Sequence, residues 1–508
     1  MSPAALAIPQ RRRLTVDVLA VGSLIGLIIR WLSLTLLAPI AVALLYGDSV
    51  WPFVVPLVGG FVIGYGIERA CGRRAGAVDV REAFAVVAIS WIAAMFLGAT
   101  PYMVEGGDIA GLVDATFETM SGFTTTGASV MSDIPSHSRA ILFWRGLTQW
   151  LGGMGIIVLA LAVLGSTGPG GRALMEREAP GPEVDKLTPR LRDTAMRLWL
   201  VYIGLSVLMV LLLVGVGLVD AGQGMGLYNA VTHTFTAMST GGFSPEARSM
   251  EVFGPIAQTI TVVFMIIAGA NFALWYRAAI GDIRTPLRDG ELRVYLGILA
   301  GASLLVAVGL LATSERDVWS SLGQATFQVV SVMTTTGFAS QDFASWTSFA
   351  LLILFATMFI GGCAGSTAGA IKVIRVRLAF GGLRRDIETA VHPEAILPVR
   401  VTGVPVRESA IQGATVFAGL YVATFAAGTA LILLIATLHG FELGAFDSMV
   451  AAATTLGNVG PGVGVAGPMG SFATYPWEAK VVMTVLMWIG RLEIIPVFVL
   501  ATRAYWVR

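Results

Sequence analysis

Long apolar stretches recur along the whole chain. About 20 apolar residues in a helix span the hydrocarbon core of a bilayer, and each stretch is close to this length or longer. The pattern therefore predicts ten membrane spans, at residues 20–46, 51–67, 82–104, 139–165, 195–219, 252–280, 293–313, 345–380, 409–438 and 478–502.

Four shorter amphipathic segments lie between these stretches, at 114–124, 229–239, 324–334 and 447–457. They are too short to cross a bilayer and indicate re-entrant helices. Each leads into a turn that contains glycine, always at the same distance. The residues that stand 13 positions before the glycines Gly127, Gly242, Gly337 and Gly460 are Asp114, Asn229, Gln324 and Asp447. Such fourfold repetition predicts one local structure in four copies.

Each turn belongs to a repeat of span, re-entrant helix and span. The repeats share one orientation, because the first span of each starts on the same side of the membrane. The predicted fold class is an all-α polytopic membrane protein, with four parallel span–pore-helix–span repeats around a central pore and an N-terminal two-helix hairpin. We divide the chain into the hairpin at 1–79 and repeats at 80–185, 186–288, 289–400 and 401–508.

The distribution of basic residues sets the orientation. Lys and Arg gather in alternate loops, at 11–13, 69–81, 172–192, 277–288, 372–407 and 503–508, whereas the opposite loops are mainly acidic. Cytoplasmic loops carry the excess of Lys and Arg, so both termini are expected in the cytoplasm. The re-entrant helices then enter and leave from the outer face.

The composition agrees with a multi-pass protein in a lipid membrane. Of the 508 residues, 56% are hydrophobic and 13% are charged, and the mean hydropathy is +0.78. The net charge of +1 gives no indication of a nucleic-acid partner. Cys71 and Cys363 give no disulfide framework. The sequence contains no catalytic, metal-ligand or phosphate-cradling motif, so we do not expect an enzyme or an organic cofactor.

The four turns are suited to a dehydrated monovalent cation. Extended backbone can present successive carbonyl oxygens in place of the water shell of the ion. Glycine permits the left-handed dihedral angles that this requires. Carbonyl dipoles, unlike carboxylates, suit an ion that must also leave. A single Thr-Gly turn could be a packing kink in a membrane helix, but four copies at one spacing favour a shared ion site.

Several stretches resemble the Trk/Ktr/HKT superfamily of potassium transporters, and within it the TrkH type of membrane subunit. The resemblance covers nearly the whole chain, including the N-terminal hairpin. The matching stretches are Phe117–Gly127, Phe143–Arg145, Gln149–Gly155, Gly269–Phe272, Gly362–Lys372 and Gly490–Ile494. The resemblance implies potassium uptake across a bacterial inner membrane through a selectivity filter.

The resemblance also implies roles for single residues. The expected filter residues, which would bind the potassium ion, are Thr125, Thr126, Gly127, Thr240, Gly241, Gly242, Thr335, Thr336, Gly337, Asn458, Val459 and Gly460. All four filter positions are Gly, which favours potassium over sodium; in the second turn either Gly241 or Gly242 could face the ion. The fourth turn departs from the Thr-x-Gly pattern, because Asn458 and Val459 replace the Thr residues.

Residues 361–370 interrupt a predicted span with several glycines. Irregular backbone at membrane depth lines a cavity or is buried in protein. The resemblance implies an intramembrane gating loop, with Gly361, Gly362, Gly365, Ser366, Thr367 and Gly369 as its gating residues. A tight helix crossing is the alternative.

Two polar residues lie inside predicted spans. The resemblance implies that Arg491 lies beneath the filter, close to the loop, as an electrostatic barrier; the alternatives are an ion pair with Glu493 or with another helix, or a side chain that snorkels to the interface. Asn271 is expected to line the pore or to form an interhelical hydrogen bond. We expect Glu118, in the first re-entrant helix, to have a structural role. The resemblance implies a homodimer on a cytosolic TrkA-like nucleotide-binding regulatory subunit.

Two other modes of transport remain as alternatives. A proton- or sodium-coupled potassium symporter would need titratable groups along its path, for which Glu118 and Glu493 are the main candidates. The potassium-binding subunit of an ATP-driven pump shares the predicted architecture. The segments around 361–370 and Arg491 match the TrkH type better.

Overall fold

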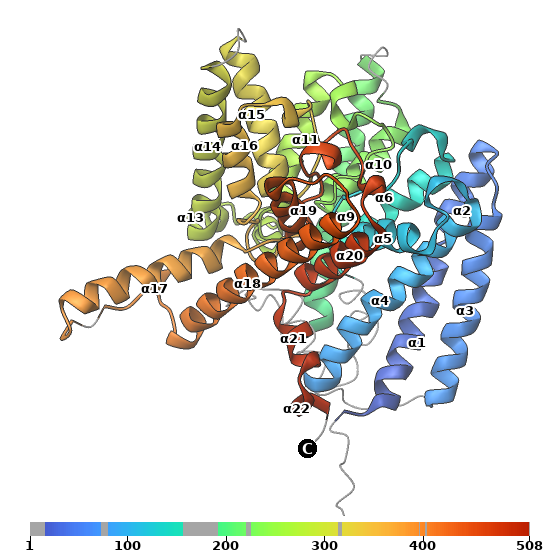
Figure 1. The fold of residues 1–508 in the computed structure, drawn as a ribbon, viewed down its shortest axis with the longest axis horizontal. Helices are drawn as coiled ribbons and strands as arrows, with labels where there is room; N and C mark the ends of the chain where they lie inside the picture. The colour runs from blue at the N-terminus through green and yellow to red at the C-terminus, as the bar shows by residue number, and fades with distance from the viewer. Residues whose placement is uncertain are drawn as a thin grey trace, which may run out of the picture.

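The structure of the chain is a computed structural model. It describes residues 16–72, 80–155, 191–219, 225–312, 317–395, 397–401 and 404–506. The N-terminal hairpin consists of α1 (Val18–Leu34) with its continuation α2 (Leu37–Tyr46), followed by α3 (Trp51–Cys71). Helices α1 and α3 lie side by side (Figure 1). Gly26 and Gly64 allow this, because a Cβ on either would come within 2.7 Å of the other's carbonyl oxygen.

The remaining helices form four repeats, each with a short helix between longer ones. The first repeat contains α4 (Val80–Glu105), α5 (Leu112–Phe123) and α6 (Arg139–Gly153). The second contains α9 (Leu191–Val219), α10 (Leu227–Met238), α11 (Pro255–Ala268), α12 (Phe272–Ala279) and α13 (Arg284–Arg288). The third contains α14 (Gly290–Leu311), α15 (Val318–Met333), α16 (Ser348–Thr357) and α17 (Val373–Val391). The fourth contains α18 (Glu408–Leu438), α19 (Ala445–Gly457), α20 (Trp477–Arg491), α21 (Ile495–Ala501) and α22 (Arg503–Trp506).

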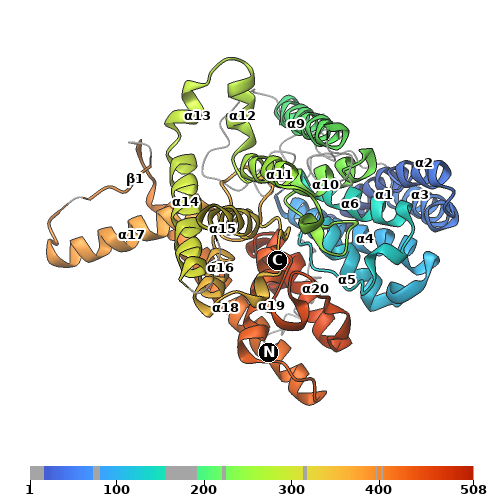
Figure 2. The same ribbon diagram turned by 90° about the horizontal axis from the view of Figure 1, so that it is seen from above.

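A short antiparallel ribbon precedes the fourth repeat. Strands β1 (Arg400–Val401) and β2 (Val404–Pro405) pair in the register Arg400 with Pro405. Together with the long helix α17, this part of the chain extends away from the rest of the molecule (Figures 1 and 2).

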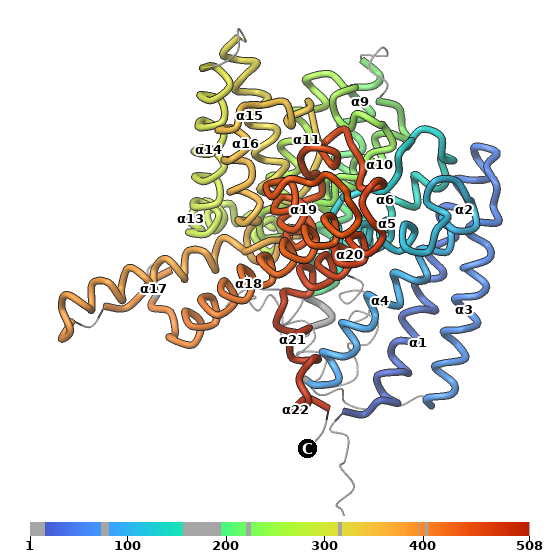
Figure 3. Tube along the Cα trace, viewed as in Figure 1, coloured from blue at the N-terminus to red at the C-terminus, as the bar shows by residue number. Residues whose placement is uncertain are grey.

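The short helices α5, α10, α15 and α19 correspond to the predicted re-entrant segments. From above they lie around a common centre (Figure 2), and Figure 3 traces the same course of the chain as a tube. Helix α15 begins six residues before the predicted start at 324, because Asp317 caps it by accepting hydrogen bonds from the amides of Trp319 and Ser320.

The second spans of the later repeats are not the continuous helices that the apolar stretches 252–280, 345–380 and 478–502 predict. Helices α11 and α12 meet at an angle of 103°, and α20 and α21 at 112°. In the third repeat, α16 ends at Thr357 and α17 begins only at Val373. Glycine lies at each break, at Gly269, Gly361 and Gly490, and glycine is a weak helix former.

Among the described residues, six helices are long and apolar enough to cross a membrane, or eight if each bent pair counts as one span. The end of the predicted span 139–165 lies outside the described residues, as do the basic segments 11–13 and 172–190. These helices support a multi-pass membrane protein, while the predicted number of ten remains a prediction.

Candidate functional site

The four short helices end in the same backbone geometry. One residue of each following turn has a positive φ: Thr125 at 55°, Thr240 at 54°, Thr335 at 58° and Asn458 at 54°. The next amide donates to a carbonyl five residues earlier. These bonds, each 2.8 Å long, join Thr126 to Ser121, Gly241 to Thr236, Thr336 to Ser331 and Val459 to Thr454. A left-handed residue followed by such a bond is a Schellman ending of a helix.

Threonine is an unusual residue at this position. Helices that end in this way usually place glycine or asparagine in the left-handed conformation, and a β-branched residue there is an outlier. Residues held in such conformations cost roughly 1–3 kcal/mol each. Three of the four turns carry this cost at Thr125, Thr240 and Thr335. The repetition makes their side chains candidates for a functional role, whereas Asn458 fits the backbone with less strain.

A second positive-φ residue follows two positions later in every turn. These residues are Gly127 at 83°, Gly242 at 75°, Gly337 at 81° and Gly460 at 111°. A Cβ on each would overlap a carbonyl oxygen of a neighbouring turn. The oxygens are Gly241 O at 2.1 Å from the Cβ of Gly127, Thr336 O at 1.8 Å for Gly242, Val459 O at 2.3 Å for Gly337 and Thr126 O at 2.7 Å for Gly460.

These contacts close a ring. They run from the first turn to the second, from the second to the third, from the third to the fourth, and from the fourth back to the first. The structure thus brings together all twelve residues that the sequence singles out in the four turns. In the second turn Gly242, not Gly241, occupies the position equivalent to Gly127, and the carbonyl of Gly241 accepts a hydrogen bond of 2.7 Å from Gln149 Nε2.

Buried polar side chains hold the turns from behind. Glu118 of α5 accepts hydrogen bonds from Ser129 Oγ at 3.0 Å and from the Val130 amide at 2.9 Å, in the segment after the first turn. It also forms a buried ion pair of 2.6 Å with Arg145. Arg145 in turn donates to the carbonyl of Ser244, after the second turn, at 2.9 Å. The structural role predicted for Glu118 agrees with these contacts.

The same position in the next two short helices also carries a polar residue that holds a turn. His233 is 2.7 Å from the carbonyl of Asn229 and 3.0 Å from Ser244 Oγ. Gln328 accepts a hydrogen bond of 3.3 Å from the amide of Ser340. Both side chains are fully buried. His233 therefore contributes to the scaffold.

Residues 361–370 form a loop whose two ends are joined. The amide of Gly361 donates to Ile371 O at 2.9 Å, and the amide of Ile371 donates to Phe359 O at 3.3 Å. Between them the backbone leaves helical geometry, as predicted for Gly361, Gly362 and Gly365. Compact loops with adjacent ends are frequently functional.

The tip of this loop contacts the broken helix of the second repeat. The Cys363 amide donates to Gly269 O at 2.8 Å, and Gly365 O accepts from the Phe272 amide at 3.1 Å. Thr367 Oγ1 donates to the carbonyls of Met238 and Ala268, at 3.2 Å each. The hydroxyl of Ser366 donates to Cys363 O within the loop.

The end of the loop reaches the ring itself. The amide of Gly369 donates a hydrogen bond of 2.8 Å to Thr335 Oγ1, in the third turn. A Cβ on Gly369 would lie 2.3 Å from the carbonyl of Gly457 and 3.0 Å from Cβ of Asn458, beside the fourth turn. The loop therefore lies directly against two of the four turns.

Arg491 joins the loop to the first repeat. Its guanidinium donates to Thr367 O at 2.8 Å, and to Gly152 O at 2.7 Å and Gly153 O at 3.1 Å at the end of α6. Glu493 instead forms an ion pair of 2.5 Å with Arg375 of α17. The structure therefore favours contact between Arg491 and the loop over the alternative of a pair with Glu493.

The break after Arg491 is strained. Ile494 has φ 62° and ψ −58°, and the amide of Ile495 bonds back to Glu493 O at 2.6 Å. This is a γ-turn with positive φ, which is rare for any residue and costly for a β-branched one. Strain of this kind concentrates at functional sites, and here it sets the direction in which α21 starts after the end of α20.

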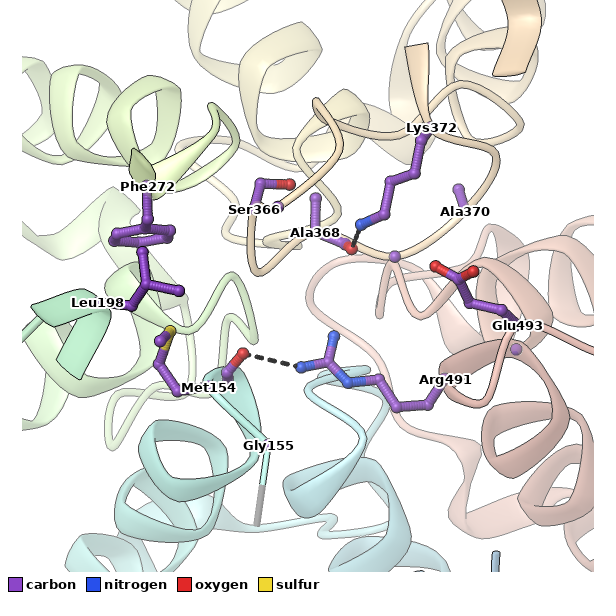
Figure 4. Close-up of a pocket in the computed structure, with 14 residues that line it drawn as sticks. Met154, Gly155, Leu198, Phe272, Ser366, Ala368, Ala370, Lys372, Arg491 and Glu493 are labelled. Atoms are coloured by element: carbon purple, nitrogen blue, oxygen red, sulfur yellow. Dashed lines mark hydrogen bonds between the residues drawn. The ribbon is translucent and has the colours of Figure 1, made fainter. Parts of the chain in front are cut away.

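A cavity open to solvent lies between the loop, the break in α20 and the end of α6 (Figure 4). The volume inside it that water-sized molecules can occupy is about 90 Å³. Lys372, Arg491 and Glu493 line it together with Ser366 and Gly369. The buried ammonium of Lys372 donates to Ala368 O inside the loop. The cavity thus carries more positive than negative side chains.

Asn271 caps a helix and lies beside the loop 361–370. Its side chain accepts a hydrogen bond of 2.9 Å from the Ala273 amide and so caps α12. It also lies against the tip of the loop, since a Cβ on Gly365 would be 2.8 Å from Asn271 Oδ1. The residues that line the cavity include its neighbour Phe272 but not Asn271.

A ring of backbone, short helices directed at it and a loop beneath it form an arrangement that can bind and retain a small cation. The C-terminal ends of α5, α10, α15 and α19 immediately precede the four turns. Each such end carries the equivalent of about half a negative charge. A family model for cation transport proteins, TrkH, matches residues 62–506 of the chain.

The chain belongs to the TrkH family.

Relatives in this family match almost end to end. The Trk system potassium uptake protein TrkH of Halomonas elongata is 36% identical over 492 residues, which cover 95% of this chain and 98% of the relative. The protein of the same name from Escherichia coli K12 is 35% identical, covering 96% of this chain and 99% of the relative. The crystal structure of the potassium transporter TrkH from Vibrio parahaemolyticus superposes with a TM-score of 0.84, at 32% identity, and covers 96% of this chain and 99% of that one.

Sequence reasoning missed three contacts of this TrkH-family chain. Gln149 holds the second turn, since its Nε2 donates to Gly241 O and its Oε1 accepts from the Phe243 amide at 3.0 Å. Lys372 enters the cavity rather than serving only as a cytoplasmic charge. The bond between Gly369 and Thr335 joins segments 34 residues apart, and no pattern in the sequence indicates it.

Proposed function

We propose that this chain conducts potassium ions across the bacterial inner membrane, inward along the membrane potential, through a filter made of the four turns. The observation that carries the proposal is the closed ring of contacts among Gly127, Gly242, Gly337 and Gly460. A ring of peptide oxygens replaces the hydration shell of an ion, and a ring fixed by close contacts keeps its size. The relatives are named as potassium uptake proteins, and for this reason we propose potassium as the ion.

Alternation of backbone handedness supports this role. In every turn a left-handed residue is followed by one with negative φ and then by a left-handed glycine, as in Thr125, Thr126 and Gly127. Extended strands point successive carbonyls to opposite sides. Alternating handedness instead turns successive carbonyls toward one side, which suits a ring of ligands. The four helix ends add negative potential below the ring.

The loop 361–370 is the proposed gate, in its closed position. It rests against the third and fourth turns and is held by Arg491, which donates to the loop carbonyl of Thr367. A cation that leaves the ring toward the cavity would meet the backbone of the loop and this guanidinium. Opening then requires the loop to move away from Thr335 and the three carbonyl bonds of Arg491 to rearrange.

The two carboxylates that a symporter would need are both engaged. Glu118 is paired with Arg145 and accepts two further hydrogen bonds. Glu493 is paired with Arg375 at 2.5 Å. Both carboxylates thus serve as partners of neighbouring side chains in this structure, and this supports passive gated conduction over proton-coupled symport.

We also propose a homodimer with both termini in the cytoplasm, regulated by a cytosolic TrkA-like nucleotide-binding subunit. Helix α17 extends from the body and exposes Phe380, Leu383, Ile387 and Val391. An exposed apolar row beside basic residues is typical of a surface that another chain covers. The cytoplasmic basic charges around 372–407 are the proposed contact for the regulatory subunit.

A current–voltage measurement on the purified, reconstituted protein tests the proposed transport. With potassium on one side and sodium on the other, a conducting filter gives a current that reverses near the potassium equilibrium potential. A reversal potential that moves with the proton or sodium gradient at fixed potassium would establish coupled symport instead. Equal permeation of sodium would overturn the assignment of the ring as a potassium filter.

A further inference from the structure

We infer that Thr335 is a positioning residue that holds the loop 361–370 against the filter, so that the closed loop and the third turn stabilise each other. The inference rests on the proposed function of the loop and deepens it. Its basis is the hydrogen bond from the Gly369 amide to Thr335 Oγ1. This bond links a residue of the ring directly to the loop beneath it.

The bond is buried and well formed. Its length is 2.8 Å, Thr335 is 1% exposed and Gly369 is buried as well. Gly369 has little freedom to find another acceptor, because it is wedged against the carbonyl of Gly457. A buried amide without a partner costs about 1–3 kcal/mol, so loss of the Thr335 hydroxyl would weaken the closed position of the loop.

The equivalent threonines of the other turns make no such contact. Thr240 Oγ1 donates to the carbonyl of its neighbour Ser239. Thr125 Oγ1 is buried and has no hydrogen-bond partner among the described residues. The three threonines share the same strained backbone, with φ between 54° and 58°. A comparison of variants at Thr335 and Thr125 therefore separates the effect of the loop contact from the effect of the strained backbone.

The coupling between the closed loop and the third turn is reciprocal. If the closed loop stabilises one conformation of the third turn, that conformation stabilises the closed loop by the same free energy. Ion occupancy of the ring and the position of the loop are then coupled through the third turn. Asn458 of the fourth turn extends the connection, since its side-chain Nδ2 donates to Thr126 Oγ1 at 3.0 Å and to Met487 O at 3.0 Å.

The test compares Thr335→Val with Thr125→Val in the full-length reconstituted protein. Potassium flux is measured in the normal chain and in a variant with a shortened loop that lacks residues 364–368. We expect Thr335→Val to raise the flux about fivefold when the loop is complete, which corresponds to about 1 kcal/mol. In the shortened variant Thr335→Val should add nothing further. The effect of Thr125→Val should be the same in both backgrounds.

A second measurement follows the loop itself. Ser366 lines the cavity, so Ser366→Cys, with Cys71 and Cys363 replaced by Ala, reports its exposure to a charged thiol reagent. Thr335→Val should speed this modification several-fold, and Thr335→Ser, which restores an acceptor, should reverse the change. Thr125→Val should not speed it.

The outcomes separate the inference from the proposed function. If shortening the loop leaves the flux unchanged, the loop is not the gate, and the modification rates still decide whether Thr335 holds it. If shortening raises the flux but Thr335→Val acts equally in both backgrounds, Thr335 acts on the ion path alone and the inference is overturned. The inference would also be overturned if Thr335→Val left the rate of thiol modification unchanged, and this holds even if the shortened variant failed to fold.

Discussion

The four ring glycines should differ in their tolerance of alanine, in an order that the contacts dictate. Each substitution places a residue other than glycine at a positive φ, which costs roughly 1–2 kcal/mol. This part is similar for all four positions, because φ lies between 75° and 111°. The differences come from the overlap between the new Cβ and the carbonyl oxygen of the neighbouring turn.

The overlaps give a graded series. Real Cβ atoms essentially never approach another heavy atom closer than 3.0 Å, and the new atom would lie at 1.8 Å in Gly242→Ala and at 2.7 Å in Gly460→Ala. The neighbouring turn must therefore retreat by about 1.2 Å in the first case and about 0.3 Å in the second. Gly127 and Gly337 fall between, at 2.1 Å and 2.3 Å.

Ion permeation should follow this order. The ratio of potassium to sodium permeability, from reversal potentials, should fall least for Gly460→Ala, further for Gly337→Ala and Gly127→Ala, and most for Gly242→Ala. Gly440→Ala is the matched control, because Gly440 has φ 64° and open space around its Cβ position. That variant should lose some thermal stability and keep its selectivity. Equal effects at the four ring positions, or a reversed order, would refute the argument from packing.

The remaining predictions concern charged side chains. Arg491→Ala should raise the rate of potassium uptake into proteoliposomes, because it removes a positive charge and the contacts that hold the loop; an equal or lower rate in a folded variant would count against the barrier. Arg145→Met should lower the free energy of unfolding by about 3–5 kcal/mol, because Glu118 would keep a buried, unpaired charge. Adding Glu118→Gln should restore part of this stability in thermal denaturation, and a further loss would contradict the reasoning. Contact with Glu105 raises the pKa of His137 above its ordinary value, burial opposes this change, and contact with Asp108 adds to it. The stabilisation is fully present below about pH 6.5 and is lost as the pH rises through the raised pKa. The melting temperature should therefore fall over this range by more in the original protein than in His137→Gln, and parallel curves would exclude the contribution of this contact.

Most of the fold could be predicted from the lengths of the apolar stretches and from the fixed spacing before each glycine. The predicted re-entrant segment 114–124 differs by two residues or fewer at either end from α5 (Leu112–Phe123), because a polar start and a terminal Thr-Gly turn mark both ends. The early start of α15 was missed, since its cap Asp317 precedes the apolar face by several residues. The capping residue was the available signal.

The breaks in the second spans were harder to predict. Hydropathy treats 252–280 as one stretch, yet Asn271 caps a new helix there. An asparagine shortly after a glycine inside an apolar run, as in Gly269-Ala270-Asn271, is a helix-start signal that the average over the run conceals. The closed ring could not be predicted from any one turn, because it depends on contacts between residues more than 90 positions apart, such as Gly127 with Gly241. Spacing indicated that the turns were equivalent, and tertiary contacts set their order.

The four quadrants of the ring are encoded separately in a single polypeptide. A channel assembled from identical subunits changes all its quadrants with every substitution, whereas here each quadrant can vary alone. The chain already uses this freedom, with Asn458 in one quadrant and Thr335 facing the loop in another. One quadrant can thus be adapted to regulation while its three neighbours preserve the dimensions that the ion encounters.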